Sequence, residues 1–164
     1  MILTDRWLRA NAAEIGYNPE FVNPASVDVC LGGHIIEYDA NGQMQEFTLA
    51  PGETFWFRPG FFYLAHTEEY TRIPEDACAQ LILKSSSGRK GLDHAHSGWG
   101  DPGFHGQWTF EFVAHRPVQF ERGQRIAQLV FMQCAEPPEQ SYLATGRYNG
   151  QVGATEARLE VSPT

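Results

Sequence analysis

The sequence is poor in basic residues. It has 12 Lys+Arg against 20 Asp+Glu, which leaves a formal net charge of -8 over 164 residues. Proteins bind the nucleic-acid polyanion through clustered Lys and Arg side chains that release counterions, and no such cluster offsets the acidity of this chain. We therefore expect no nucleic-acid partner.

Long apolar runs are also missing. No run approaches the roughly 20 residues that cross a bilayer. The opening segment, Met1 to Asp5, lacks the basic start and the apolar stretch of a signal peptide. We expect a cytoplasmic protein with no membrane partner.

Cysteine is scarce. Cys30, Cys78 and Cys134 are odd in number, far apart and surrounded by apolar, strand-like sequence. This pattern excludes a disulfide framework and predicts three reduced, buried thiols.

Apolar material for a core is present. Hydrophobic residues make up 42% of the chain and aromatic residues 13%. This composition and the length fit one compact domain over residues 1–164, and they exclude a disordered chain.

Only the start of the chain is typical of a helix, where Thr4 can cap a segment that runs to about Ala13 with Trp7, Leu8 and Ala12 on one apolar face. The remainder indicates short β-strands between Gly, Pro and Asn turn formers. The expected strands are 26–31, 34–38, 45–49, 54–57, 61–66, 78–84, 107–113 and 125–132. Many short strands at this spacing predict a sandwich, a jelly roll or a distorted barrel.

The segment after Pro137 has few large apolar residues and several glycines. It still carries Tyr142, Arg147, Tyr148 and Gln151, so a lid and a frayed terminus are both open interpretations. We expect residues 137–164 to form an arm that is ordered only where it meets a partner or a ligand.

The segment Lys-Ser-Ser-Ser-Gly-Arg-Lys-Gly at 84–91 places three hydroxyls, three cations and two glycines in eight residues. Hydroxyls and backbone N–H groups of a short helical turn can surround phosphate oxygens, while Arg and Lys neutralise their charge. No Walker-type spacing is present, so a solvated Ser/Gly loop is an equally good interpretation.

In the expected strand 107–113, alternation places Trp108, Phe110 and Phe112 on one face and Glu111 on the other. On a wet face Glu111 is an ordinary surface carboxylate, which is the commoner case. In a cleft, partial desolvation raises the pKa of such a carboxyl towards the range of a general acid or base.

Two histidines, His94 and His96, share a strand face ahead of Asp101. Together they loosely resemble the metal motif of the cupins. The usual Glu is replaced by an Asp within an Asp-Pro-Gly turn, and a second cupin motif is missing. Ordinary hydrogen-bonded histidines are the simpler interpretation.

Several motifs, taken in order, resemble those of the dCTP deaminase family, the relatives of the trimeric dUTPases. Segment 24–32 resembles an early strand motif that ends in Asp-x-x-Leu-Gly, and 51–60 resembles the next two strands and their turn. Segment 84–92 is similar to Arg-Ser-Ser-Leu-x-Arg-x-Gly-Leu, with Lys84 in place of the first Arg.

Segment 94–104 is similar to the family's His-x-Thr-Ala-Gly-Trp-Ile-Asp-Pro-Gly-Phe, and segments 123–129 and 147–151 complete the order. The resemblance implies an all-β distorted jelly roll, or β-clip, of the dUTPase-like type with a short N-terminal helix. It also implies a homotrimer with active sites at subunit interfaces and an arm that closes over a deoxynucleoside triphosphate. The implied activity is deamination of dCTP to dUTP and ammonia, either ending there or continuing to dUMP and diphosphate.

The resemblance assigns roles by position. Glu111 matches the catalytic glutamate, Ser85 the serine that holds the water and Arg89 the arginine that supports the site. Ser97 falls at the alanine whose backbone carbonyl helps to hold the water, and Asp101 holds the deoxyribose 3′-hydroxyl.

The nucleotide contacts follow in the same way. Lys84 and Ser86 contact phosphates, as do Arg147 and Gln151 from the arm, and Phe104 packs on the sugar. The remaining expected contacts are Gly98, Trp99, Tyr142 and Tyr148, with His94 as a candidate regulatory or phosphate contact.

The implied chemistry needs no metal bound by the protein. Glu111 takes a proton from water, the hydroxide adds to C4 of cytosine, and the same carboxylic acid passes the proton on until ammonia leaves. Zinc deaminases carry a Pro-Cys-x-x-Cys signature, which this chain lacks, so no zinc is expected. Mg2+ is expected as a counterion bound through the triphosphate.

Three departures from the motif lie where the base and the water belong. Segment 92–101 is one residue shorter, Gly100 replaces Ile, and His96-Ser97 replaces Thr-Ala. They leave open a reshaped loop, a different pyrimidine such as a 5-substituted one, or a nucleotide-binding regulatory protein without turnover. A dUTP diphosphatase in which Asp101 activates the water is a further alternative, although trimeric dUTPases generally lack the glutamate at position 111.

Overall fold

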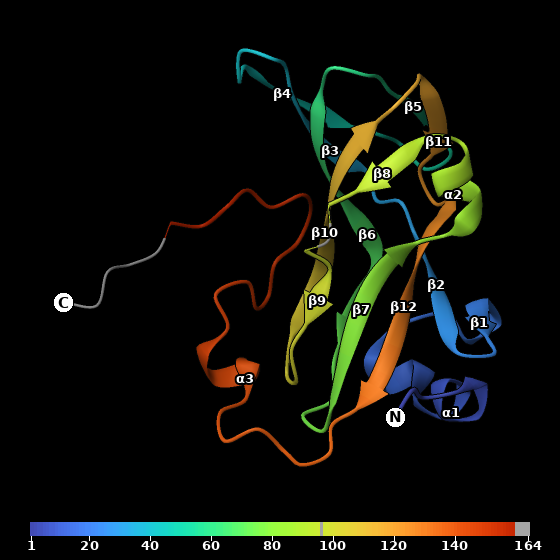
Figure 1. The fold of residues 1–164 in the computed structure, drawn as a ribbon, viewed down its shortest axis with the longest axis vertical. Helices are drawn as coiled ribbons and strands as arrows, with labels where there is room; N and C mark the ends of the chain where they lie inside the picture. The colour runs from blue at the N-terminus through green and yellow to red at the C-terminus, as the bar shows by residue number, and fades with distance from the viewer. Residues whose placement is uncertain (96, 160–164) are drawn as a thin grey trace.

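The computed structural model describes residues 1–95 and 97–159. His96 and residues 160–164 lie outside this range, and with them the expected pairing of His94 with His96. Figure 1 shows a β-protein in which helices occupy the periphery. The helical segments are α1 (Asp5–Ile15), η1 (Pro19–Phe21), α2 (Ser85–Arg89) and α3 (Tyr142–Thr145).

The strands form two five-stranded sheets and a two-stranded ribbon, all with antiparallel pairing among the described strands. The first sheet has the order β1 (Val22–Asn23), β2 (Ser26–Cys30), β12 (Arg125–Gln133), β7 (Ala77–Leu83) and β9 (Trp99–Gly100). The second has the order β4 (Met44–Thr48), β3 (His34–Tyr38), β6 (Phe62–Arg72), β10 (His105–Ala114) and β8 (Leu92–His94). The ribbon pairs β11 (Val118–Glu121) with β5 (Thr54–Phe57).

One apolar cluster joins the two large sheets. Leu129 and Phe131 of β12 belong to the same buried cluster as Phe110 and Phe112 of β10. The rings of Phe110 and Phe112 stack with centroids 4.7 Å apart. The alternation expected for β10 is confirmed, because its apolar face is buried while Glu111 lies on the opposite, partly exposed face.

All eight strands expected from the sequence are present, and β6 continues to Arg72. The short strands β1, β8, β9 and β11 were not predicted, because two to four residues give too little periodicity to recognise. The expectation that all of the chain after the first helix is β is wrong for η1, α2 and α3.

Helix α1 begins directly after Thr4 and ends at Ile15, two residues later than expected. Leu8, Ala12 and Ile15 are its buried residues, which confirms the amphipathic pattern. The Thr4 side chain makes no capping hydrogen bond, so the predicted cap is wrong in this respect. Gly16 ends the helix in the left-handed conformation with φ of 101°.

The three cysteines are free, as expected, but only Cys30 is buried. Cys78 and Cys134 are partly exposed because they lie at the open end of the β7–β12 pair, where Cys134 N–H donates to the Asp76 carbonyl at 2.9 Å. None of the described helices is long and apolar enough to span a bilayer.

The described part of the arm, 137–159, packs on its own chain. Gln151 forms a parallel bridge with Gly106 of β10, and the Gln151 side-chain amide donates to the Gln107 carbonyl at 2.7 Å. Further along, Ala154 N–H donates to His34 Nδ1 at 3.2 Å. These contacts place the arm across the second sheet, on the side of the molecule away from α2 (Figure 1).

Candidate active site

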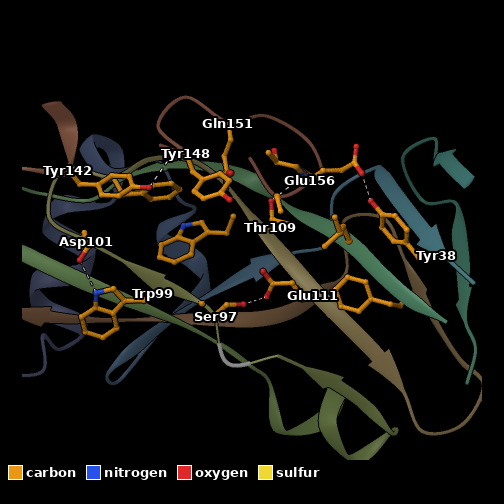
Figure 2. A pocket seen from close by; sticks show the side chains of 17 residues that line it. Tyr38, Ser97, Trp99, Asp101, Thr109, Glu111, Tyr142, Tyr148, Gln151 and Glu156 are labelled. Atoms are coloured by element: carbon orange, nitrogen blue, oxygen red, sulfur yellow. Dashed lines mark hydrogen bonds between the residues drawn. The ribbon is translucent and has the colours of Figure 1, made fainter. Parts of the chain in front are cut away.

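A cavity of about 620 Å³ lies between the exposed face of β10, the loop that enters β9 and the arm (Figure 2). Many of the residues expected at the site line it: Ser97, Gly98, Trp99, Asp101, Phe104, Glu111, Tyr142, Tyr148 and Gln151. The other lining residues are Tyr38, Phe62, Leu64, Trp108, Thr109, Thr155, Glu156 and Ala157.

Glu111 points from β10 into this cavity (Figure 2). Its cross-strand partner is Leu64 of β6, so an apolar side chain borders the carboxylate. Burial raises the pKa of Glu111, and the hydrogen bond from Ser97 opposes that rise. The structure thus supports the cleft interpretation of Glu111 over the surface one.

The Ser97 hydroxyl donates a hydrogen bond to Oε2 of Glu111. The loop that carries it is fixed to β10 and β7, because Ala95 N–H donates to the Glu111 carbonyl at 2.9 Å and Leu81 N–H donates to the Gly98 carbonyl at 2.7 Å. The Ser97 carbonyl, expected to help hold the water, accepts from Trp99 N–H at 3.0 Å and keeps a second lone pair. The side-chain contact was not predicted, since the resemblance pointed only to the main chain.

His94 lies behind Glu111. Its ring is buried and meets Phe110 and Phe112 edge-on, with centroids 5.8 and 5.9 Å away. His94 Nε2 is 3.8 Å from Glu111 Oε2. His94 therefore lies next to the Glu111 carboxylate in this chain. The described residues contain no group of three or more His, Cys, Asp or Glu that could hold a metal ion.

Asp101 lies at the other end of the cavity, in the Asp-Pro-Gly turn that the sequence predicted. Phe104 N–H donates to the Asp101 carbonyl at 3.0 Å and closes that turn. The indole Nε1–H of Trp99 donates to Asp101 Oδ1 at 3.1 Å and orients the carboxylate.

Two aromatic rings form the floor beside Asp101. Phe104 and Trp108 meet edge-to-face with centroids 5.1 Å apart, and the Trp108 indole N–H donates to Thr71 Oγ1 at 2.8 Å. A Cβ at Gly100 would lie 2.3 Å from Trp108 Cη2. Position 100, where the family motif has Ile, is therefore a glycine because the Trp108 indole occupies the space that a larger side chain would need.

The arm covers the cavity through Tyr142, Tyr148 and Gln151. At its far end the Tyr38 hydroxyl donates to Glu156 Oε1 at 2.5 Å. Burial and this hydrogen bond raise the pKa of Tyr38 to about 12. Arg147 is exposed and is not among the lining residues.

The predicted phosphate segment does not reach the cavity. Ser85, Ser86 and Arg89 lie on α2 and are exposed, and Lys84 donates to the buried carboxylate of Asp28. The hydroxyl of Ser87 faces inward and donates to the Ile126 carbonyl at 2.8 Å. A single chain thus brings the acidic half of the predicted site together and leaves the α2 half outside it.

The family described as dCTP deaminase-like matches residues 2–134. The chain is 38% identical to the "dCTP deaminase, dUMP-forming" of Aquifex aeolicus (strain VF5), over 98% of this chain and 96% of that protein. It is 39% identical to the protein of the same name from Bifidobacterium animalis subsp. lactis (strain AD011), over 96% and 94% of the two chains.

Among solved structures, the 2'-deoxycytidine 5'-triphosphate deaminase from Agrobacterium tumefaciens matches with a TM-score of 0.65 at 23% identity. The match covers 79% of this chain and 47% of that one, so this chain spans about half of its length. The likeness confirms the predicted all-β fold of the dUTPase-like type. By its sequence, the chain belongs to the dCTP deaminase-like family.

Proposed function

We propose that the protein hydrolyses dCTP in two steps, first to dUTP and ammonia and then to dUMP and diphosphate, with one water consumed in each step. The observation that carries the proposal is the half-buried Glu111 carboxylate in a cavity that also contains Asp101. The relatives named dUMP-forming favour the two-step reaction over deamination alone.

In the first step Glu111 acts as general base and then as general acid. Its carboxylate takes a proton from water, the hydroxide adds to C4 of cytosine, and the electron pair of the C4–N3 double bond moves to N3. The protonated carboxyl then gives its proton to the departing amine, which leaves as ammonia, and the proton on the C4 hydroxyl moves to N3 as the carbonyl of uracil forms. Because burial raises the pKa of Glu111, its carboxylate is a stronger base towards water in the first half of this step than an exposed glutamate.

The second step cleaves the bond between the α- and β-phosphates. Asp101 faces the cavity from the turn before Phe104 and is the candidate group to hold the sugar 3′-hydroxyl and to orient the attacking water. Phe104 offers an apolar surface for the deoxyribose. Mg2+ bound through the triphosphate oxygens supplies neutralising charge when present, in keeping with its preference for oxygen ligands.

The negative charge of the cavity indicates that a single chain does not form the complete site. Its lining contains three carboxylates, Asp101, Glu111 and Glu156, and among the described lining residues there is no Lys or Arg. A triphosphate needs cationic partners, and Arg89 of α2 and the next residue, Lys90, are exposed on the surface. We propose a homotrimer in which α2 of one subunit faces the cavity of the next.

The test is product analysis of purified protein with Mg2+ and dCTP, dUTP or dCMP as parallel substrates. The proposal predicts dUMP and ammonia from dCTP, and dUMP from dUTP. Accumulation of dUTP as the end product would restrict the protein to deamination. Turnover of dUTP alone would identify a diphosphatase, and no product from any of them would overturn the proposal.

A further inference from the structure

The loop between β8 and β9 places a hydroxyl directly on the proposed general base. Ser97 Oγ donates to Oε2 of Glu111, at the position where the family motif has Ala. An alanine offers no donor, so this hydrogen bond is a property of this chain's own loop.

We propose that Ser97 is a positioning residue that holds the Glu111 carboxylate towards the cavity in its ionised form, ready to take a proton from water. The inference rests on the proposed function, because it assigns a role within the deamination step.

The geometry that supports it is fixed from both sides. The loop is tied to β10 by the hydrogen bond from Ala95 N–H to the Glu111 carbonyl, and to β7 by the one from Leu81 N–H to the Gly98 carbonyl. Within the loop, Ser97 N–H donates to the Ala95 carbonyl at 2.8 Å. The hydroxyl is therefore held next to the carboxylate by backbone contacts rather than by its own rotamer alone.

The residues around the Glu111 carboxylate leave it partly in an apolar environment, in which a hydrogen-bond donor stabilises its charge. On β6 the neighbour of Glu111 is the apolar Leu64, and from β8 the His94 Nε2 lies 3.8 Å from Oε2. The other titratable groups that line the cavity are Asp101 on the β9 side, Tyr38 on β3, and Tyr142, Tyr148 and Glu156 on the arm.

Burial disfavours the charged carboxylate, whereas a hydroxyl that donates to it favours the charged form. With Ser97 in place the pKa of Glu111 is lower than burial alone would make it. Removing the donor raises that pKa, so the ionised fraction falls on the acidic side. The base is then lost at a higher pH than in the wild type.

The experiment is the pH profile of kcat/KM for dCTP in wild type, Ser97→Ala and Ser97→Thr. We expect Ser97→Ala to move the acidic limb of the profile to higher pH by about one unit. At pH values below the limb kcat/KM should then fall roughly tenfold, and above the limb it should change little. Ser97→Thr keeps the hydroxyl and should restore the wild-type limb. Ser26→Ala, which removes a serine hydroxyl bonded to Gln128 away from the cavity, is the matched control and should leave the limb in place.

A uniform loss at every pH in Ser97→Ala, or a limb that does not move, would overturn the proposal in favour of a structural role. A second readout separates this inference from the proposed function. In nucleotide-free protein labelled with 13C at the Glu side-chain carboxyl, the Glu111 signal is identified by its absence in Glu111→Gln. Its titration should move to higher pH in Ser97→Ala even if dCTP is not the substrate, and an unchanged titration would contradict the role of Ser97.

Discussion

The cavity beside β10 and the α2 turn, which comprises residues 85–90, carry opposite kinds of polar group. The cavity holds carboxylates, and Glu111 among them is half-buried with a raised pKa. The α2 turn carries exposed hydroxyls and the exposed cations Arg89 and Lys90. In the proposed function the first region transfers protons and the second binds phosphates, so the complete site needs both.

This difference shows how the two regions are built. Glu111 lies on β10, a ten-residue strand that pairs with β6 on one edge and with β8 on the other. The surroundings of its side chain are therefore set by the sheet. Helix α2 has five residues and depends on anchors at its base, where Ser87 Oγ donates to Ile126 and Arg116 Nε donates to the Lys90 carbonyl at 2.6 Å. Its outer side chains remain available for a partner.

The largest expected effect tests whether proton transfer resides in the cavity. Glu111→Gln keeps the shape but cannot take a proton, so ammonia release from dCTP should fall by about 1,000-fold, within the range for loss of a general base. Nucleotide affinity, measured by calorimetry, should stay within about threefold because the amide occupies the same volume. Glu121→Gln on β11 is the control and should remain active. A fully active Glu111→Gln would show that the cavity is not where the chemistry occurs.

The next effect tests whether the α2 region belongs to the same site. Arg89→Ala should reduce kcat/KM for dCTP by about 100-fold, although Arg89 lies outside the cavity of its own chain. The Arg89→Ala and Glu111→Gln proteins, mixed in equal amounts and allowed to exchange subunits, should recover about a quarter of the wild-type activity. At about one interface in four, the cavity of an Arg89→Ala chain then meets the α2 turn of a Glu111→Gln chain, and both halves of that site are intact. Two variants that stay inactive when mixed, although they exchange subunits, would place both halves within one chain.

A smaller effect tests the floor of the cavity. Gly100→Ile forces a side chain against the Trp108 indole, since a Cβ at position 100 would lie 2.3 Å from Trp108 Cη2, and it should lower the Tm by about 5 °C. The double variant Gly100→Ile with Trp108→Ile frees that space and should recover most of the loss in a thermal melt. No recovery in the double variant would refute the idea that the two residues compensate in volume.

The smallest effect concerns the far end of the arm. Tyr38→Phe removes the hydrogen bond to Glu156 without changing the ring, so the KM for dCTP should rise about threefold while kcat changes little. Tyr17→Phe removes a hydroxyl that bonds to Leu8 in α1 and serves as the control. A KM equal to that of wild type would show that this contact does not help the arm to cover the cavity.

The regular strands and the position of Glu111 could be predicted from the sequence because alternation is a local property. The same alternation that buried Phe110 and Phe112 set Glu111 on the opposite face. Whether that face lined a cleft was not predictable, since the cleft is closed by the arm, whose Ala154 meets His34 across 120 residues of sequence.

The contact of Ser97 with Glu111 was missed for a different reason. A loop of irregular backbone carries no periodicity, and motif comparison placed Ser97 at a position where only the main chain was expected to act. The fit of Gly100 against Trp108 was hidden in the same way, because the two residues lie on different strands and only their contact explains the departure at position 100.

Strand β12 connects the α2 turn to the arm that covers the cavity. Near its start Ile126 accepts the hydrogen bonds that anchor α2, and its last residue, Gln133, leads into the arm. In the proposed trimer each chain therefore serves two different nucleotides, one through its cavity and one through its α2 turn. A chain that lacks both a working cavity and a working α2 turn would inactivate two of the three sites in its trimer. Inactive chains would therefore lower the activity of a mixed population by more than the fraction of chains that they make up.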